Sequence, residues 1–226
     1  MPPAAKDRGT GEEWTDNGKK DMEHSKHVTV LVPGGLLAPD SLAAINTVAR
    51  KYNLTFYLST AQNLRLLGAS EENLEEIKGA LTGLGLTLKG PCKFPKPRVC
   101  TGMPYCNLGL VDTFGLSNKI WSRFGGRTGV KPKFKIAISG CPASCAGSML
   151  VDIGIIATRS GFDVYAGGKG GPLPKVGKRI ARGLSEQEVA DLVGEIADYH
   201  ASRTEKKQRM AKLVDEPDFP RRTGTP

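Results

Sequence analysis

Four of the five cysteines fall into two pairs whose spacing points to metal chemistry. Cys100 and Cys106 form a C-x5-C pair, Cys141 and Cys145 form a C-x3-C pair, and 34 residues separate the two pairs. Four thiolates are the full ligand set of a [4Fe–4S] cluster. Structural zinc instead uses closer pairs, C-x2-C to C-x4-C, that converge on one ion. The spacing therefore favours a cluster over zinc, and over four unrelated core cysteines.

The fifth cysteine, Cys92, stands outside this pattern. An odd number of cysteines, in a chain that begins with no apolar segment typical of a secretory signal, argues against a disulfide framework. We interpret Cys92 as an unligated thiol that the core could bury. The three histidines, His24, His27 and His200, are peripheral to the cysteine pairs in sequence and are assigned no ligand role.

The net charge of +9 is concentrated in one stretch of the chain. Residues 89–135 contain ten basic residues and a single acid, Asp112, so this stretch alone sums to +9 and the rest sums to zero. A basic face could bind nucleic acid, but aromatic residues for base stacking are only 6% of the chain. A pocket for an anion is favoured, because the charge surrounds the first cysteine pair and ends just before the second. The basic residues are Lys89, Lys93, Lys96, Arg98, Lys119, Arg123, Arg127, Lys131, Lys133 and Lys135.

The first half of the folded chain alternates between strand and helix patterns. Strands are expected at 28–32, 54–58, 64–67 and 86–88, with helices from about residue 40 and, capped by Ser70, over 74–84. The order β-α-β-β-α-β predicts a ferredoxin-like sandwich, with helices on one face of an antiparallel sheet. The overall fold class is therefore α+β.

The second half predicts a mixed α/β layer around the cysteines. Strands are expected at 135–139, 151–158 and 162–166, and Ser185 with Glu188 forms a capping box for the last helix. Four segments follow: a disordered arm at 1–26, the ferredoxin-like half-domain at 27–90, the cysteine domain at 91–203, and a charged tail at 204–226. The glycine-rich run 167–171 is interpreted as a flexible turn.

The composition predicts a soluble cytoplasmic protein. Hydrophobic residues make up 39% of the chain, enough for a real core. No apolar run approaches the roughly 20 residues that cross a bilayer, so no membrane partner is expected.

The sequence motifs around the cysteines resemble those of the siroheme-dependent nitrite and sulfite reductases. V-C-T-G-M-P-Y-C-N-L-G-L, I-S-G-C-P-A-S-C-A-G and V-D-I-G-I-I match in the second half, and S-T-A-Q-N-L-R-L-L-G at 59–68 matches in the first. The resemblance covers roughly residues 28–200. The chain is about half the length of the duplicated enzymes, and looks most like the small assimilatory-type sulfite reductases that carry one copy of the repeat.

The resemblance implies a cofactor set and its ligands. Cys100, Cys106, Cys141 and Cys145 would ligate a [4Fe–4S] cluster, and Cys145 would also bridge to the siroheme iron as its axial ligand. A thiolate shared by cluster and macrocycle is a short path for electrons. Siroheme is an octacarboxylate, and buried carboxylates need cationic partners. The residues expected to bind it are Arg98, Arg123, Arg127, Lys131 and Gln62.

The same resemblance implies an anion site. Lys133 and Lys135 match a K-x-K pair that contacts the substrate in the family, and alternation on a strand would place both ammonium groups on one face. Arg98 is the candidate for an arginine that the family uses shortly before the cluster region. Alignment on Gln62 places Ala61 where another anion-binding arginine usually stands, and Arg65, about 13 Å along the strand, is too far to replace it.

The implied activity is the six-electron reduction of sulfite to sulfide. Nitrite reduction at the same site, or electron transfer without catalysis, are the alternatives. No flavin or nicotinamide fingerprint is visible, so electrons would come from an acidic ferredoxin-like donor attracted by the basic residues.

Overall fold

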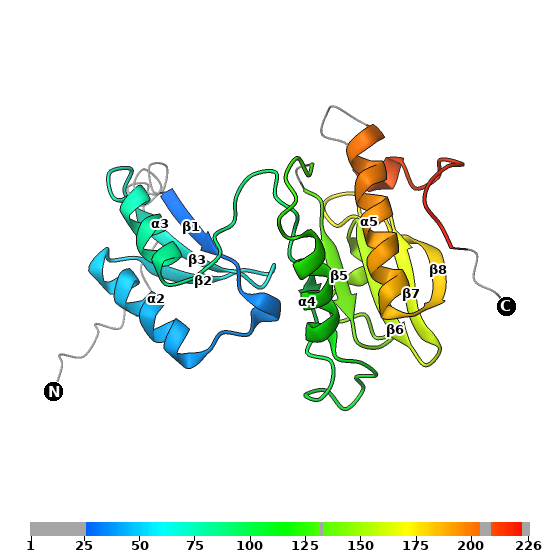
Figure 1. Cartoon of the computed structure of the whole chain (residues 1–226), viewed down its shortest axis with the longest axis horizontal. Helices are drawn as coiled ribbons and strands as arrows, with labels where there is room; N and C mark the ends of the chain where they lie inside the picture. Colours follow the sequence, from blue (N-terminus) through cyan, green and yellow to red (C-terminus); the bar gives the residue numbers. More distant parts are fainter. Residues whose placement is uncertain (1–25, 132, 204–208, 223–226) are drawn as a thin grey trace.

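The computed structural model describes residues 26–131, 133–203 and 209–222, which form two lobes lying side by side (Figure 1). The predicted N-terminal arm, except for Lys26, lies outside the described residues. The first lobe has its own hydrophobic core, centred on residues such as Val30, Ile45 and Leu66. The second lobe is built around a larger core that includes Leu116, Ile138 and Val193.

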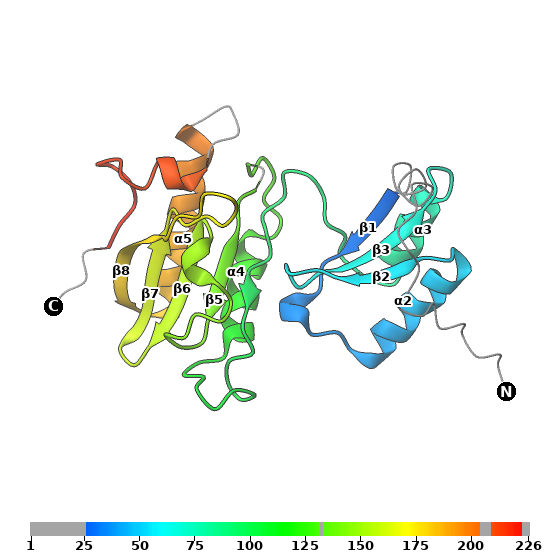
Figure 2. The same cartoon turned by 180° about the vertical axis from the view of Figure 1, so that it is seen from behind.

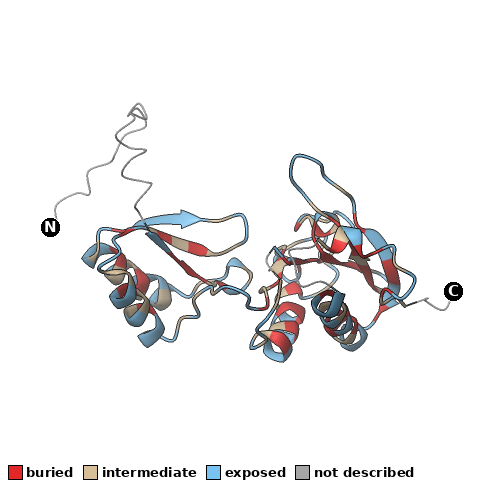
Figure 3. Ribbon diagram, turned by 90° about the horizontal axis from the view of Figure 1, so that it is seen from above, coloured by how far each residue is buried: buried red, intermediate tan, exposed pale blue. Residues whose placement is uncertain are grey.

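The first lobe is the ferredoxin-like half that the sequence predicts. Its strands β1 (Lys26–Val30), β2 (Thr55–Leu58) and β3 (Leu64–Ala69) form an antiparallel sheet in the order β1-β3-β2. Helices α2 (Pro39–Lys51) and α3 (Leu74–Gly83) pack on one face of this sheet, as Figure 3 makes clear from above. A short turn of 3-10 helix, η1 (Pro33–Gly35), extends toward the second lobe.

Two details of this lobe differ from the prediction. The expected fourth strand at 86–88 is reduced to one antiparallel bridge, between Leu88 and Val30. Ser70 does not cap α3 directly. Its hydroxyl accepts a hydrogen bond from the backbone N–H of Asn73, and the Asn73 side chain accepts one from the N–H of Ser70, so the pair closes the turn before the helix. Asn73, not Ser70, stands at the N-cap position.

The second lobe contains a five-stranded mixed sheet in the order β4-β5-β6-β7-β8. The first three strands are parallel and the last two are antiparallel to their neighbours. Strands β5 and β6 are apolar and buried along nearly their whole length, as expected of central strands covered on both faces. The strands are β4 (Arg98–Val99), β5 (Ile136–Ser139), β6 (Ile153–Thr158), β7 (Gly161–Ala166) and β8 (Lys178–Leu184).

The two faces of this sheet carry different elements. Helices α4 (Thr113–Phe124) and α5 (Glu186–Arg203) cover one face, where Ile136 and Ile138 of β5 join the main core (Figure 2). On the other face Ala137 packs with Ala146 and Val151, beside Cys100. Because successive side chains of a strand point to opposite faces, those of β5 alternate between the face covered by the helices and the face that carries the cysteine loops.

A glycine lets the cysteine-bearing segment lie directly on the sheet. The 3-10 turn η2 (Ser148–Leu150) follows the second cysteine pair and crosses over β6 at Gly154. A Cβ atom at Gly154 would lie only 1.8 Å from the carbonyl oxygen of Ser148, so no other residue fits without moving the turn.

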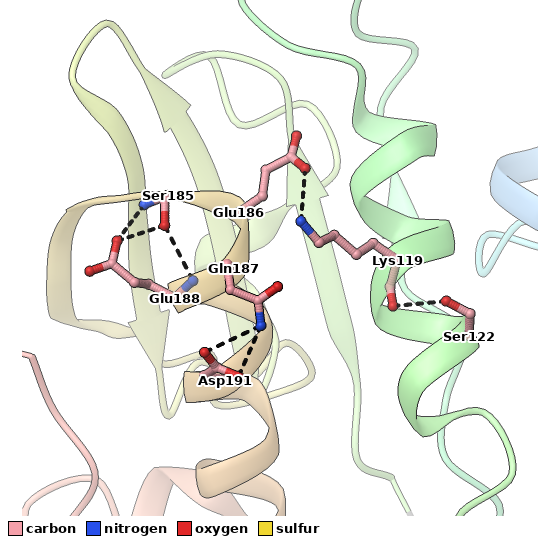
Figure 4. A network of polar contacts seen from close by, with 7 residues as sticks. All are labelled: Lys119, Ser122, Ser185, Glu186, Gln187, Glu188 and Asp191. Atoms are coloured by element: carbon pink, nitrogen blue, oxygen red, sulfur yellow. Dashed lines mark hydrogen bonds and ion pairs between the residues drawn. The ribbon is translucent and has the colours of Figure 1, made fainter.

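Figure 4 shows the polar contacts at the start of α5, including the ion pair of Glu186 with Lys119 that joins this helix to α4. The predicted capping box is confirmed, because Glu188 accepts from the backbone N–H of Ser185 and the Ser185 hydroxyl accepts from the N–H of Glu188. One residue into the helix, Glu186 accepts from the ammonium group of Lys119 on α4 at 3.5 Å. The capping box therefore defines the start of α5, and the exposed ion pair with Lys119 links this end of the helix to α4.

The predicted charged tail is partly wrong. Residues 209–222 pack on the second lobe, and Met210, Leu213, Val214 and Phe219 are buried in its core. The segment includes the 3-10 turn η3 (Met210–Lys212). The charged residues and prolines of this segment predicted a tail, but its four apolar side chains are part of the core. Within the described residues, no helix is both long and apolar enough to span a membrane.

Candidate functional site

The two cysteine pairs lie on loops that leave neighbouring parallel strands. Cys100 follows β4 and Cys141 comes two residues after β5, and because these strands are parallel their carboxyl ends meet at one edge. The backbone N–H of Gly140 points at the sulfur of Cys100, 3.1 Å away. The N–H of Leu110 donates to the carbonyl oxygen of Gly140 at 2.8 Å, which ties the first loop to the second.

The first cysteine loop is closed by a tight packing contact. Gly102 has a positive φ of 58°, and a Cβ atom there would lie 2.7 Å from the hydroxyl oxygen of Thr113. That hydroxyl donates to the carbonyl oxygen of Cys100 at 2.7 Å. The N–H of Cys106 donates to the carbonyl oxygen of Gly102 at 2.8 Å, so both cysteines of the pair are held by one turn.

Two buried serines hold the second loop. The hydroxyl of Ser139, the last residue of β5, accepts from the backbone N–H of Ala146 and shares a 2.8 Å hydrogen bond with Ser148. Ser139 and Ser148 are both fully buried. They fix the backbone on either side of Cys145, and sequence analysis did not single them out.

All five cysteines are free thiols, and the four paired ones suit a cluster. Cys100, Cys106 and Cys141 are partly buried, whereas Cys145 is exposed. Within the described part of the chain, no three His, Cys, Asp or Glu side chains converge as ligands of one metal ion would. The cysteines of a cube bind separate iron atoms and need not converge on a point, and the Gly140 N–H directed at a sulfur is the kind of donor that cluster sulfurs accept.

A cationic cleft of about 420 Å³ opens between the two lobes. Leu31, Thr60, Ala61 and Asn63 line it from the first lobe. Residues 89–96, 98, 130, 131, 133–136 and 151 line it from the connection and the second lobe. Seven lining residues are basic and none is acidic, so the cleft selects for an anion. The seven are Lys89, Lys93, Lys96, Arg98, Lys131, Lys133 and Lys135.

Arg98 connects the cleft to the cysteine loops. It lines the cleft, and its guanidinium Nη2 would lie 3.1 Å from a Cβ atom at Gly147, two residues after Cys145. Its Nε is buried without a hydrogen-bond partner among the described residues. Partial burial also lowers the pKa of Arg98 from its ordinary value. An orphaned donor on a partly desolvated cation is what a bound carboxylate or oxyanion would satisfy.

Lys133 and Lys135 both line the cleft, but the prediction that they alternate along a strand is wrong. Strand β5 begins at Ile136, after both lysines, and Lys133 lies in a turn with a φ of 69°. Phe134 between them is buried and packs its ring 5.5 Å from that of His200. The buried aromatic ring, and not strand alternation, anchors the segment that presents the two exposed ammonium groups. His200, interpreted as peripheral, is buried here.

Three residues expected to bind the tetrapyrrole lie elsewhere. Arg123 pairs with Asp191 and Arg127 with Asp198, both on α5, and neither arginine lines the cleft. Gln62 turns its side chain to the backbone of Val99, donating to its carbonyl oxygen at 2.6 Å and accepting from its N–H at 2.8 Å. Gln62 therefore ties Val99, the β4 residue between Arg98 and Cys100, to the first lobe.

The remaining expectations concern Ala61, Arg65 and Cys92. Ala61 does line the cleft. Arg65 is not among the lining residues and stacks on the ring of Tyr57, 5.8 Å from its centre. Cys92 is exposed and lines the cleft, so burial in the core is wrong for this thiol.

Comparison with known proteins places this site in a family. Residues 95–220 match the nitrite and sulphite reductase 4Fe-4S domain, and residues 17–84 match the nitrite/sulfite reductase ferredoxin-like half domain. The chain therefore belongs to the nitrite and sulfite reductase family.

The relatives include both kinds of enzyme. The chain is 31% identical over 185 residues to an assimilatory-type sulfite reductase of Nitratidesulfovibrio vulgaris, covering 81% of this chain and 84% of that protein. It is also 31% identical over 187 residues to a nitrite reductase [NAD(P)H] of Emericella nidulans, covering 81% of this chain but only 17% of that protein. The fold is similar to that of a dissimilatory sulfite reductase I, with a TM-score of 0.74 at 16% identity over 84% of this chain and 66% of that one.

Proposed function

We propose that this protein reduces sulfite to sulfide, six electrons in all, in the cationic cleft between its lobes. The observation that carries the proposal is the placement of seven cations and no acid around one cleft, adjoining the loops that bear four cysteines. The 31% identity to an assimilatory-type sulfite reductase, over 84% of that relative, supports sulfite as the substrate.

The chain's own residues fit the family's cofactors. Cys100, Cys106, Cys141 and Cys145 would hold a [4Fe–4S] cluster, and the exposed Cys145 would also face a siroheme iron. When bound, this pair supplies single electrons and an open coordination position for a small oxyanion. Lys89, Lys93, Lys96 and Lys131 would neutralise the carboxylates of the tetrapyrrole.

Lys133, Lys135 and Arg98 would hold the substrate anion. The two lysines are exposed, and each ammonium group has three hydrogen-bond donors, while Arg98 offers a planar guanidinium group from a partly buried position. Their positive charge stabilises the negative charge that grows on oxygen as each S–O bond breaks. The two ammonium groups can also deliver protons to the departing oxygens.

Electrons would come from a separate protein. A ferredoxin-like donor with an acidic surface fits the basic rim of the cleft, because complementary charge speeds association. A salt-dependent rate of reduction by such a donor, and not by a neutral one, is the expected result.

Nitrite is the second candidate substrate, favoured by the equal identity to a nitrite reductase. Ala61, in place of the family's anion-binding arginine, leaves a more open anion site that could accept either ion.

Steady-state kinetics on both anions, with an artificial reductant, tests the proposal. The protein is purified from a host that makes both cofactors. We expect a higher kcat/KM for sulfite than for nitrite. A higher value for nitrite would reverse the assignment of substrate. A coloured protein that reduces neither anion would be an electron-transfer protein and would refute the proposed catalysis.

A further inference from the structure

A buried carboxylate holds the backbone of one of the cleft lysines. Asp152 is only 1% exposed and directly follows Val151, which lines the cleft. Its Oδ2 atom accepts a hydrogen bond from the backbone N–H of Lys135 at 3.1 Å. Lys135 stands just before β5, so this bond fixes the point from which its side chain extends into the cleft.

The same carboxylate is held from the other side by the C-terminal segment. Arg209 reaches both of its oxygens, with Nε 3.2 Å from Oδ1 and Nη2 3.2 Å from Oδ2. The next residue, Met210, is fully buried in the main core and donates a backbone hydrogen bond to Asp152. A two-pronged arginine contact of this kind fixes the orientation of the carboxylate as well as its charge.

Removing Arg209 from this arrangement would leave the buried carboxylate of Asp152 without its counter-ion. Burial raises the pKa of Asp152 above its ordinary value, and Arg209, with the Lys135 N–H, acts in the opposite direction. A buried charge without its partner is strongly destabilising. The carboxylate therefore needs Arg209. The carbonyl oxygen of Lys135 accepts separately from the backbone N–H of Ile153 at 3.1 Å, so the carboxylate is needed for the N–H side of Lys135.

We propose that Asp152 is a positioning residue for Lys135, and that Arg209 of the C-terminal segment holds Asp152 in its working orientation. Anion binding in the cleft then depends on residues 209–222, a segment that does not line the cleft. The inference rests on the proposed role of the cleft as an anion site.

Three variants and one matched control test this proposal in the full-length protein carrying its cofactors. Asp152→Ala removes the acceptor for Lys135, Asp152→Asn keeps an oxygen that can accept the N–H, and Arg209→Gln removes the counter-ion alone. The control, Arg222→Gln, removes another arginine of the same segment, which pairs with Glu195 on α5 instead. Hydrogen exchange of the Lys135 amide and the KM for sulfite and nitrite are measured for each.

We expect Asp152→Ala to speed exchange at Lys135 about tenfold and to raise KM about tenfold, with kcat changed less than KM, as loss of one charged hydrogen bond would do. Asp152→Asn should restore most of the protection at Lys135. Arg209→Gln should produce a smaller rise in both quantities, and Arg222→Gln should match the unaltered protein.

The proposal is overturned if the variants only lower the unfolding temperature and leave both Lys135 exchange and KM unchanged. That result would define a purely structural ion pair. Should Asp152→Ala fail to fold, exchange at Lys135 and KM in Arg209→Gln and Asp152→Asn test the proposal in its place. If the unaltered protein reduces neither anion, the proposed function fails, but exchange at Lys135 still decides whether Asp152 positions this residue.

Discussion

Replacing Lys133 by glutamine tests the anion site with little change in side-chain size. Lys133 lines the cleft from an exposed turn and contributes charge without a buried packing role. Removing its ammonium group should therefore weaken binding of the substrate anion and leave the cofactor spectrum intact. We expect the change to appear in KM for sulfite, with a smaller effect on kcat.

The size of the effect follows from the exposure of the side chain. Two unit charges about 4 Å apart interact by about 1 kcal/mol in water and about 4 kcal/mol at the effective dielectric constant near a protein surface. The exposure of Lys133 favours the lower end of this range. A loss of about 1.4 kcal/mol corresponds to a tenfold rise in KM.

A matched control separates local contact from general electrostatic attraction. Lys119→Gln removes the same formal charge from α4, where Lys119 pairs with Glu186 outside the cleft (Figure 4). Steady-state kinetics at low and high salt is the assay, because screening weakens long-range attraction more than a close contact. An unchanged KM in Lys133→Gln, or an equal rise in Lys119→Gln, would refute the assignment of Lys133 to the anion site.

Three further predictions follow from the cleft, the cysteines and α5. Ala61→Arg places a cation on the cleft wall and should lower KM for sulfite severalfold in the same assay; a raised KM would mean that the anion binds elsewhere. Cys145→Ser should abolish turnover and uncouple the siroheme absorption from the cluster's redox state; full activity would exclude this cysteine as the shared ligand. Ser185→Ala should lower the free energy of unfolding by about 1 kcal/mol in thermal denaturation. The backbone N–H of Ser185 and then its hydroxyl lower the pKa of Glu188, so the stability from this carboxylate is present above its unfolded pKa and lost as the pH falls. Ser185→Ala keeps the backbone donor and removes the hydroxyl, so a difference from the unaltered protein that is independent of pH would contradict the hydroxyl's part in this shift.

Sequence reasoning was strongest where a local pattern determines the structure. The capping box at Ser185 and the alternating order of the first lobe are local signals, and both are present apart from the last strand of the lobe, which is reduced to one bridge. Helix α4 was missed although Leu116, Ile120 and Phe124 form a buried stripe behind the N-cap residue Asp112. Its glycine and aromatic residues are weak helix formers, so packing against the sheet and α5 decides its structure.

Long-range partners could not be predicted in the same way. The basic stretch predicted an anionic pocket, and seven of its ten cations do line one cleft. Nothing local distinguishes these seven from Arg123 and Arg127, which pair with carboxylates about 70 residues further along the chain. The ion pair between Asp152 and Arg209 was equally hidden, because Arg209 belongs to the segment that was predicted to be a charged tail.

Cofactor content tests the central claim most directly: that Cys100, Cys106, Cys141 and Cys145 hold an iron–sulfur cluster beside a tetrapyrrole. The measurement is iron, acid-labile sulfide and extractable siroheme per chain, after expression in a host that makes all three available. We predict about five iron atoms, about four sulfides and about one siroheme per chain, as a cube and one macrocycle require. Protein that contains neither labile sulfide nor tetrapyrrole, or that holds one zinc ion on these cysteines, would contradict the account.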